Sequence, residues 1–378
     1  MPQNPPGREN GFWKRLKNNR SFAMKLSHRL GWEEKKPFFT IGVIAAILAA
    51  LGLFLIGIQT ISEGAHGVSH LLEKTFGRPS PVRALGIGWL FAYLMLSGSP
   101  VAAAALTFFN SGAIDLFAAF TMIVGSRFGA IFVTLFFGLL YYLQGTHSQK
   151  SLAVGVIAYL TTFTIAFGSL LVGLAILPWT RFTFQLPRLF SIGVETLARP
   201  VVGPLSELLP SWALFWAGLA ILLISFKILD RALPDPGKHV DQFKIQRYLS
   251  SPGAMFLLGL GITFLTPSVT VSCGILVPFY AKGYIKSSRL VPYVMGANIS
   301  TFSDTLMAAL VINNPLAVHV VMVEVIAISL VSLIVLFFFF NRYESMIERW
   351  SQYFIGNIVR LAAFLAVIFL IPLLLIWI

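Results

Sequence analysis

The sequence predicts an all-α polytopic membrane protein that consists of two inverted repeats with re-entrant or broken helices. Composition is the first reason. Of the 378 residues, 57% are hydrophobic and 11% are charged, whereas an average soluble domain carries about 25% charged residues. The mean hydropathy is +0.80. A water-soluble globule needs a more polar surface than this composition provides, so most of the chain is expected to lie in lipid.

Long apolar stretches are the second reason, because a helix needs about 20 apolar residues to cross a bilayer. We expect spans near 38–61, 82–110, 113–143, 151–178, 212–229, 252–281, 289–312, 317–340 and 354–378. The longest connector, 179–211, is rich in proline and is expected to lie along the membrane interface.

These stretches define four parts. They are a basic cytoplasmic N-terminal tail (1–36), membrane repeat 1 (37–178), a connector with an interfacial segment, one span and a cytoplasmic loop (179–251), and membrane repeat 2 (252–378).

The net charge of +13 is interpreted as a sign of topology, with no nucleic acid as a partner. Lysine and arginine gather in 1–36 and in the loop 227–247. Such segments favour the cytoplasmic side, here of a plasma or inner membrane. Five apolar stretches lie between them, and five crossings would separate the two segments. Stretch 82–110 is interrupted at Gly98 and Pro100, so we expect it to enter and leave by one face. The alternative is a single kinked span.

A repeat at an offset of 171 residues is the third reason. Ser97 matches Ser268, Ser99 matches Thr270, Gly112 matches Gly283 and Gly125 matches Gly296, and the spacings of 13 residues between successive landmarks are preserved. If 82–110 is re-entrant, three crossings separate the copies, which inverts the second one. In that copy, 252–281 is then expected to be re-entrant and broken at Pro267. Inverted repeats are a common plan of secondary transporters.

Helix breaks inside lipid leave backbone groups unpaired at several kcal/mol each, so they persist where they line a polar cavity. Helix N-termini at such breaks favour an anion. The predicted substrate-binding residues at the two breaks are Ser97, Gly98, Ser99, Ser268, Thr270 and Ser272. The alternative is that these hydroxyl groups only pair broken backbone or allow close helix packing.

Several motifs carry a family resemblance. Residues 296–301 read Gly-Ala-Asn-Ile-Ser-Thr, residues 52–57 read Gly-Leu-Phe-Leu-Ile-Gly, and residues 110–112 read Asn-Ser-Gly. The chain thereby resembles the sodium-dependent phosphate cotransporters over roughly 48–135 and 253–310. The resemblance implies two inverted repeats and phosphate as the substrate. No cofactor is expected other than Na⁺.

The chain departs from the family at the Gln-Ser-Ser-Ser motif that each repeat of those proteins carries. Leu96 and Pro267 occupy the glutamine positions, and the first Gly-Ala-Asn-Ile motif reads Gly-Ser-Arg-Phe at 125–128.

Arg127 lies about halfway along 113–143, where a charge costs at least about 2.5–3.5 kcal/mol. We expect it to face a cavity or a partner and to bind substrate. Its repeat mate is Asn298, so the guanidinium is expected to replace one bound sodium ion or to bind the anion directly. The alternative is a purely structural ion pair.

The predicted coupling-ion residues are Asn298, Ser300, Thr301 and Asp304. Asp304 or Glu324 is expected to carry a coupling proton or to neutralise Arg127.

Together these features predict a secondary active transporter of phosphate or a related small anion, coupled to Na⁺ or H⁺, with alternating access about a midplane site. The sequence holds no HExxH, P-loop or Gly-x-Ser-x-Gly motif, so no enzyme is expected. The partners expected are the anion and membrane lipids, and no feature defines an oligomeric state. Two alternatives stay open: an intramembrane protein or enzyme that handles a lipid phosphate, and a transport-inactive regulatory or assembly subunit of the same fold.

Overall fold

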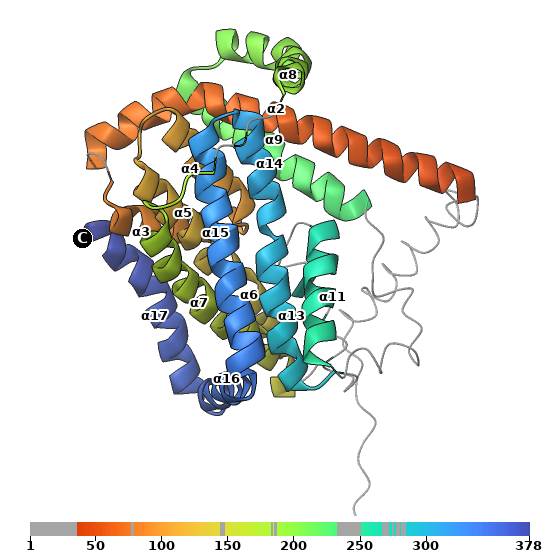
Figure 1. Cartoon of the computed structure of the whole chain (residues 1–378), viewed down its shortest axis with the longest axis vertical. Coiled ribbons are helices and arrows are strands. Elements are labelled where there is room, and N and C mark those ends of the chain that lie inside the picture. The colour runs from red at the N-terminus through yellow and green to blue at the C-terminus, as the bar shows by residue number, and fades with distance from the viewer. Residues whose placement is uncertain are drawn as a thin grey trace, which may run out of the picture. The chain divides into compact units, whose positions relative to one another are not determined.

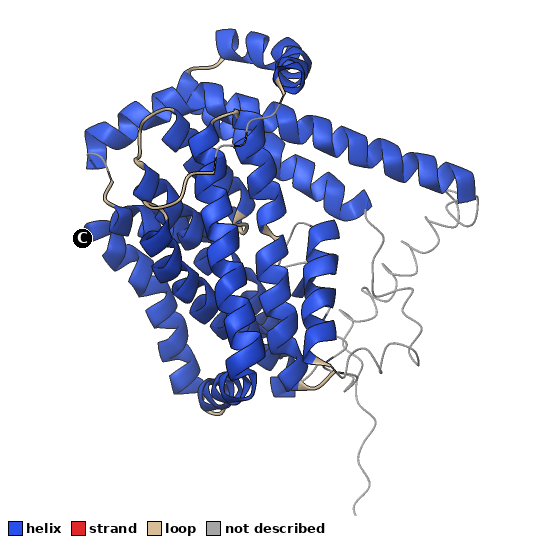
Figure 2. Ribbon diagram, viewed as in Figure 1, coloured by secondary structure: helices blue, strands red, loops and turns tan. Residues whose placement is uncertain are grey.

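The computed structural model describes residues 36–76, 79–143, 148–182, 184, 187–232, 251–266, 272, 273, 276, 280 and 285–378. Within these residues every regular element is a helix, and no strand is formed (Figure 2). Seven of the described helices are long and apolar enough to cross a membrane. The prediction of an all-α polytopic membrane protein is therefore confirmed. The chain divides into two units, Met1–Ala49 and Ala50–Ile378, and the packing below is that of the second.

Figure 1 shows the described elements and labels the α-helices among them. They are α2 (Lys36–Phe76), α3 (Pro81–Met95), α4 (Ser99–Asn110), α5 (Leu116–Ala130), α6 (Phe132–Leu143), α7 (Ser148–Ile176), α8 (Arg188–Leu208), α9 (Ser211–Ala232), α11 (Pro252–Leu265), α13 (Ser287–Ser300), α14 (Phe302–Ile312), α15 (Pro315–Ile334), the π-helix η1 (Val335–Phe339), α16 (Phe340–Ile355) and α17 (Ile358–Trp377).

The stretch 82–110 is interrupted, as predicted from its glycine and proline. Helix α3 ends at Leu96, which adopts the left-handed conformation with φ 50° and whose N–H group donates to the carbonyl of Tyr93. Helix α4 begins at Ser99, with Pro100 in its first turn. Proline has no N–H group to lose there, and its fixed φ suits a helix start. The interruption therefore places the N-terminus of α4 within a continuous run of buried residues, 98–108.

Two stretches that we expected to be single helices are each divided in two. The stretch 113–143 divides at Ile131 into α5 and α6, and 289–312 divides at Thr301 into α13 and α14. Both residues keep helical dihedral angles, with φ/ψ of −67°/−20° and −64°/−14°, so each division is a local kink. Neither stretch has a proline at the kink, which is why the sequence pattern did not predict it.

Glycine permits very close packing in two helix pairs, α3 with α5 and α11 with α13. A Cβ atom on Gly88 would lie 2.1 Å from the Met122 carbonyl oxygen, and one on Gly125 would lie 2.1 Å from that of Leu85. On Gly259 the distance would be 2.0 Å from the oxygen of Tyr293, and on Gly296 it would be 2.0 Å from that of Phe256. All four positions of the first pair recur 171 residues later in the second. Small residues of this kind let helix backbones approach within a membrane.

Helices α5 and α14 run in opposite directions. Asn314 donates to the side chain of Asn110 at 2.9 Å, which places the start of α5 and the end of α14 at one end of the bundle. Farther along α5, Arg127 contacts Thr301 at the start of α14. The two helices are therefore antiparallel, with the end of α5 beside the start of α14.

The C-terminal stretches differ from the expected spans. Helix α15 continues through η1 into α16, which Figure 1 shows almost end-on beside the end of α15. Helix α16 is amphipathic. It buries Ile347 and Ser351 and exposes Trp350 and Tyr353, and the last two are residue types enriched at membrane interfaces. We infer that α16 lies along the membrane surface.

The N-terminus of α5 offers a test of local stability. The Asp115 side chain accepts a hydrogen bond from the N–H group of Ala118 at 2.7 Å. Asp115→Ala is expected to lower stability by about 1 kcal/mol, because the cap is lost. The measurement is the thermal unfolding midpoint in detergent, with Asp115→Asn as the variant that retains a cap. Equal midpoints for the two variants would contradict this role.

Candidate functional site

Arg127 lies inside the bundle with 5% of its surface exposed. Its Nη1 donates to the Thr301 hydroxyl at 3.3 Å and its Nη2 to the Thr305 hydroxyl at 2.7 Å. The guanidinium carbon lies 4.1 Å from the centre of the Phe302 ring, a cation–π geometry. The first turn of α14 therefore holds the guanidinium on two sides. Its Nε is buried without a hydrogen-bond partner, which leaves one free donor.

Two buried carboxyl groups, Asp304 on α14 and Glu324 on α15, interact with the positive charge of Arg127. Oδ1 of Asp304 accepts hydrogen bonds from the backbone and the hydroxyl group of Thr305. Ser99, at the start of α4, also stabilises the Asp304 carboxylate, although Oδ2 has no hydrogen-bond partner of normal geometry. With both carboxyl groups ionised, the cluster carries one positive and two negative charges.

Glu324 is fully buried. Its Oε1 lies 2.8 Å from the hydroxyl oxygen of Ser169 on α7, and its Oε2 is buried without a partner. We call Arg127, Asp304, Glu324, Thr301 and Thr305 the charged cluster.

The predicted coupling-ion residues are distributed over three places. Thr301 and Asp304 belong to the charged cluster. Asn298 pairs with Thr162 on α7, and the two polar atoms of its amide lie 3.0 and 3.2 Å from the threonine hydroxyl. The Ser300 hydroxyl donates back to carbonyl groups of its own helix at 3.4 Å.

The predicted substrate residues of the first break lie close to the charged cluster. Ser99 is buried beside Asp304, and Ser97 is half-buried. Gly98 packs against α5, because a Cβ atom there would lie 3.0 Å from the Ser126 carbonyl oxygen.

The second break is described only in part. Ser268, Thr270 and the expected break residue Pro267 lie outside the described residues. Ser272 is buried, and its hydroxyl oxygen lies 2.6 Å from that of Thr263 on α11 and 2.8 Å from that of Tyr293 on α13. The structure therefore joins Ser272 to its own repeat, and Ser99 to the charged cluster.

Sequence reasoning did not single out several residues that the structure places in this region. They are Thr162, Ser169, Phe302 and Thr305. A partial signal was present, since Thr301 and Thr305 are four residues apart and such residues share one face of a helix. The hydroxyl groups inside the apolar stretch 151–178 were a second signal.

A cavity of about 210 Å³ reaches Asp304 between α2, α9, α11 and α14. Its walls are mainly apolar, with Phe54, Phe226 and Met307 among them. Asp304 is thus a member of the charged cluster that borders open space.

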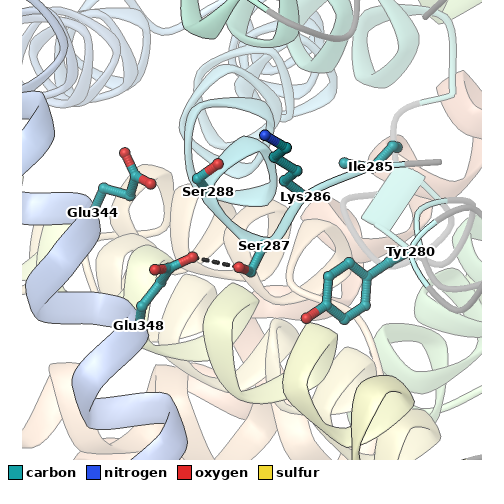
Figure 3. Close-up of a pocket in the computed structure, with 7 residues that line it drawn as sticks. All are labelled: Tyr280, Ile285, Lys286, Ser287, Ser288, Glu344 and Glu348. Atoms are coloured by element: carbon teal, nitrogen blue, oxygen red, sulfur yellow. Dashed lines mark hydrogen bonds between the residues drawn. The ribbon is translucent and has the colours of Figure 1, made fainter. Parts of the chain in front are cut away.

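A larger cavity of about 480 Å³ lies at the N-terminus of α13 (Figure 3). Its lining is Tyr280, Ile285, Lys286, Ser287, Ser288, Glu344 and Glu348. Ser287 donates to the carboxylate of Glu348, which ties α13 to α16. The lining mixes one lysine with two glutamates, so acidic groups outnumber basic ones there.

These features define a class: a polytopic, all-helical membrane protein with a cluster of ionisable groups enclosed among its spans. Charges at this depth are expensive and mark ion or substrate pathways.

Comparison with known proteins shows what part of the chain is similar to. Residues 221–370 match the model of the Na⁺/Pi-cotransporter family, and the resemblance seen in the sequence motifs is thereby confirmed. The sodium-dependent phosphate transport protein 2A of Mus musculus is 32% identical over 99 residues, which are 26% of this chain and 16% of the mouse protein. The protein of the same name from Rattus norvegicus is 32% identical over 94 residues, 24% of this chain and 15% of its own length. No solved structure is significantly similar to the chain.

Proposed function

We propose that this chain is a secondary active transporter of phosphate or a related small anion, driven by Na⁺ or H⁺, with its substrate site at the charged cluster. The observation that carries the proposal is the Arg127 guanidinium, buried between spans with a free Nε donor. A guanidinium is the side chain best matched to phosphate oxygens. The similar proteins of mouse and rat are named as sodium-dependent phosphate transporters.

The N-terminus of α4 adds a second group of donors. The first N–H groups of a helix lack partners within it and favour negative charge. No side chain caps this end, and Ser99 lies beside Asp304, which in turn faces Arg127. In our proposal the anion lies between the start of α4 and Nε of Arg127.

The carboxyl groups provide acceptors for the driving ion. Asp304 Oδ2 has no hydrogen-bond partner of normal geometry and Glu324 Oε2 is buried without a partner, and an anion placed beside them would add further negative charge. A cation or proton at one of these oxygens offsets that charge. Binding of the anion and of the driving ion would thus favour one another.

Alternating access would arise from the two repeats. The helix starts and the close glycine contacts recur at an offset of 171 residues, and α5 and α14 run in opposite directions. These observations support inverted copies that rock about the central site. Four of the seven candidate spans lie between the two basic segments. An even number of crossings would place both basic segments on the same side, which supports a cytoplasmic location for both. In our proposal the membrane is a plasma or inner membrane.

The test is uptake of radiolabelled phosphate into proteoliposomes under a sodium gradient, a proton gradient or no gradient. We expect accumulation with a gradient only.

Thr305→Val is expected to reduce uptake about tenfold or more, because a hydrogen bond to a buried charge is lost. Thr180→Val is the matched control, since the hydroxyl group of Thr180, which follows α7, donates to the Ile176 carbonyl at the end of that helix. Absence of uptake of phosphate and of other oxyanions under either gradient would contradict the proposal, and turnover of a phosphorylated lipid would then favour an enzyme.

A further inference from the structure

The hydroxyl group of Ser169 has two neighbours that accept hydrogen bonds. The Ala166 carbonyl oxygen lies 2.9 Å from Oγ, and Glu324 Oε1 lies 2.8 Å from it. A serine hydroxyl carries a single hydrogen but also has lone pairs. It cannot donate fully to both neighbours, so two full hydrogen bonds require a second hydrogen at this contact.

A proton on Glu324 satisfies this arrangement. The carboxylic acid would donate from Oε1 to Oγ of Ser169, and Ser169 would donate to the carbonyl of Ala166. Each hydrogen then has one acceptor, and Oε2 becomes an uncharged carbonyl oxygen. An ionised Glu324 would instead leave Oε2 as a buried charged atom without a partner, which is far more costly than an unpaired neutral atom.

The charges around Glu324 lead to the same assignment. Helix α15 packs against α7, α14, α5, α13 and α4. On these helices Arg127 interacts with Glu324 through its charge, and Asp304 interacts with Arg127. The only other ionisable side chain on α15 is His319, whose ring is bonded to the Phe182 N–H group and lies 3.3 Å from the Leu177 carbonyl oxygen. Arg127 and Asp304 neutralise one another, so a proton on Glu324 makes the whole cluster neutral.

We propose that Glu324 is a proton-binding site, which holds its proton on Oε1 and donates it to Ser169. The step is a simple protonation: the carboxylate takes up one proton from water and becomes a carboxylic acid. This site is separate from the Asp304 carboxyl, whose Oδ1 accepts from Thr305.

The proposed transport function gives this proton a role, and the next step rests on that function. An ionised Glu324 attracts the guanidinium of Arg127 and therefore competes with an incoming anion. Protonation removes this competition, so the proton and the anion bind with positive cooperativity. Glu324 would then carry the coupling proton of an anion–proton symport.

Infrared spectroscopy tests the proton site without reference to transport. The full chain in lipid at neutral pH is expected to show a carbonyl-stretch band of a buried protonated carboxylic acid, which Glu324→Gln removes. Glu207→Gln, on the exposed face of α8, should leave the band unchanged. Ser169→Ala is a second variant, expected to shift the band because the acid loses its acceptor. A spectrum that neither Glu324→Gln nor Ser169→Ala changes would overturn the proposal.

Phosphate uptake by the same variants tests the coupling. One coupled proton supports about a tenfold concentration ratio for each pH unit of gradient. Glu324→Gln should lose this accumulation yet retain exchange of labelled for unlabelled phosphate, since the glutamine mimics the neutral acid. The variant and the unmodified chain are compared at the same pH values, so the ionisation of phosphate itself is the same for both. Accumulation by Glu324→Gln equal to that of the unmodified chain would overturn the coupling role. If Glu324→Gln loses the infrared band but the unmodified chain shows no phosphate flux, the proton site stands and the proposed transport function is rejected.

Discussion

Replacement of Arg127 by glutamine should destabilise the folded protein by about 3–5 kcal/mol, the usual effect of removing one partner from a buried charge pair. The variant leaves the Asp304 carboxyl group buried without its cation, and it also removes the bonds to Thr301 and Thr305. Such a loss is a large part of the stability of a typical domain. The measurement is the thermal unfolding midpoint in detergent, together with the yield of monodisperse protein.

The second variant of this experiment restores charge balance. Arg127→Gln combined with Asp304→Asn places two neutral amides where two charges stood, and replacement of a whole buried pair is often close to neutral. We therefore expect the double variant to regain most of the lost stability but none of the phosphate uptake. The double-mutant cycle gives the coupling energy of the pair. A single variant as stable as the unmodified protein, or a double variant that is less stable than both single variants, would show that the two side chains do not compensate one another.

Substitution of Gly296 by alanine should have the next largest effect. The new Cβ atom would lie 2.0 Å from the Phe256 carbonyl oxygen, which belongs to a backbone that cannot rotate away. Helices α11 and α13 must separate, and overpacking of this kind costs about 1–3 kcal/mol or more. Gly125→Ala is expected to act in the same way between α5 and α3, where the distance is 2.1 Å.

Gly261→Ala on α11 is the control for this prediction. No atom lies within 4 Å of the position that its Cβ would take, so the change should be neutral or should stabilise the helix by about 1 kcal/mol. The readout is again the unfolding midpoint. Similar midpoints for Gly296→Ala and Gly261→Ala would mean that the close approach of the two helices does not limit stability.

The main outline of the fold could be predicted from the sequence because lipid imposes a simple rule on composition and length. The interruption at Gly98 and Pro100 was visible for a similar reason, since these residues act on the backbone directly. The kinks at Ile131 and Thr301 have no such marker. Helix α16 was missed because its residues are too polar for a span, and amphipathic helices at interfaces obey a different pattern.

The site was predictable only in part. The position of Arg127 in an apolar stretch showed that it needed a partner. Its partners Thr301 and Thr305 are 174 and 178 residues away in sequence, and only the packing of α5 on α14 brings them together. Ser272 was grouped with Ser99 by chemistry, but the structure bonds it to Thr263 and Tyr293, because neighbours in three dimensions decide which hydroxyl groups meet.

The Arg127 guanidinium held by α14 also affects how much charge would cross the membrane in the transport cycle that we propose. Arginine keeps its charge at any pH that proteins encounter, and this one is fastened to the protein by Thr301, Thr305 and Phe302. It supplies a positive charge that never dissociates into either solution. The current measured per phosphate moved should then count only the ions that leave, so this transporter would respond less to membrane voltage than one in which a sodium ion occupies the same place.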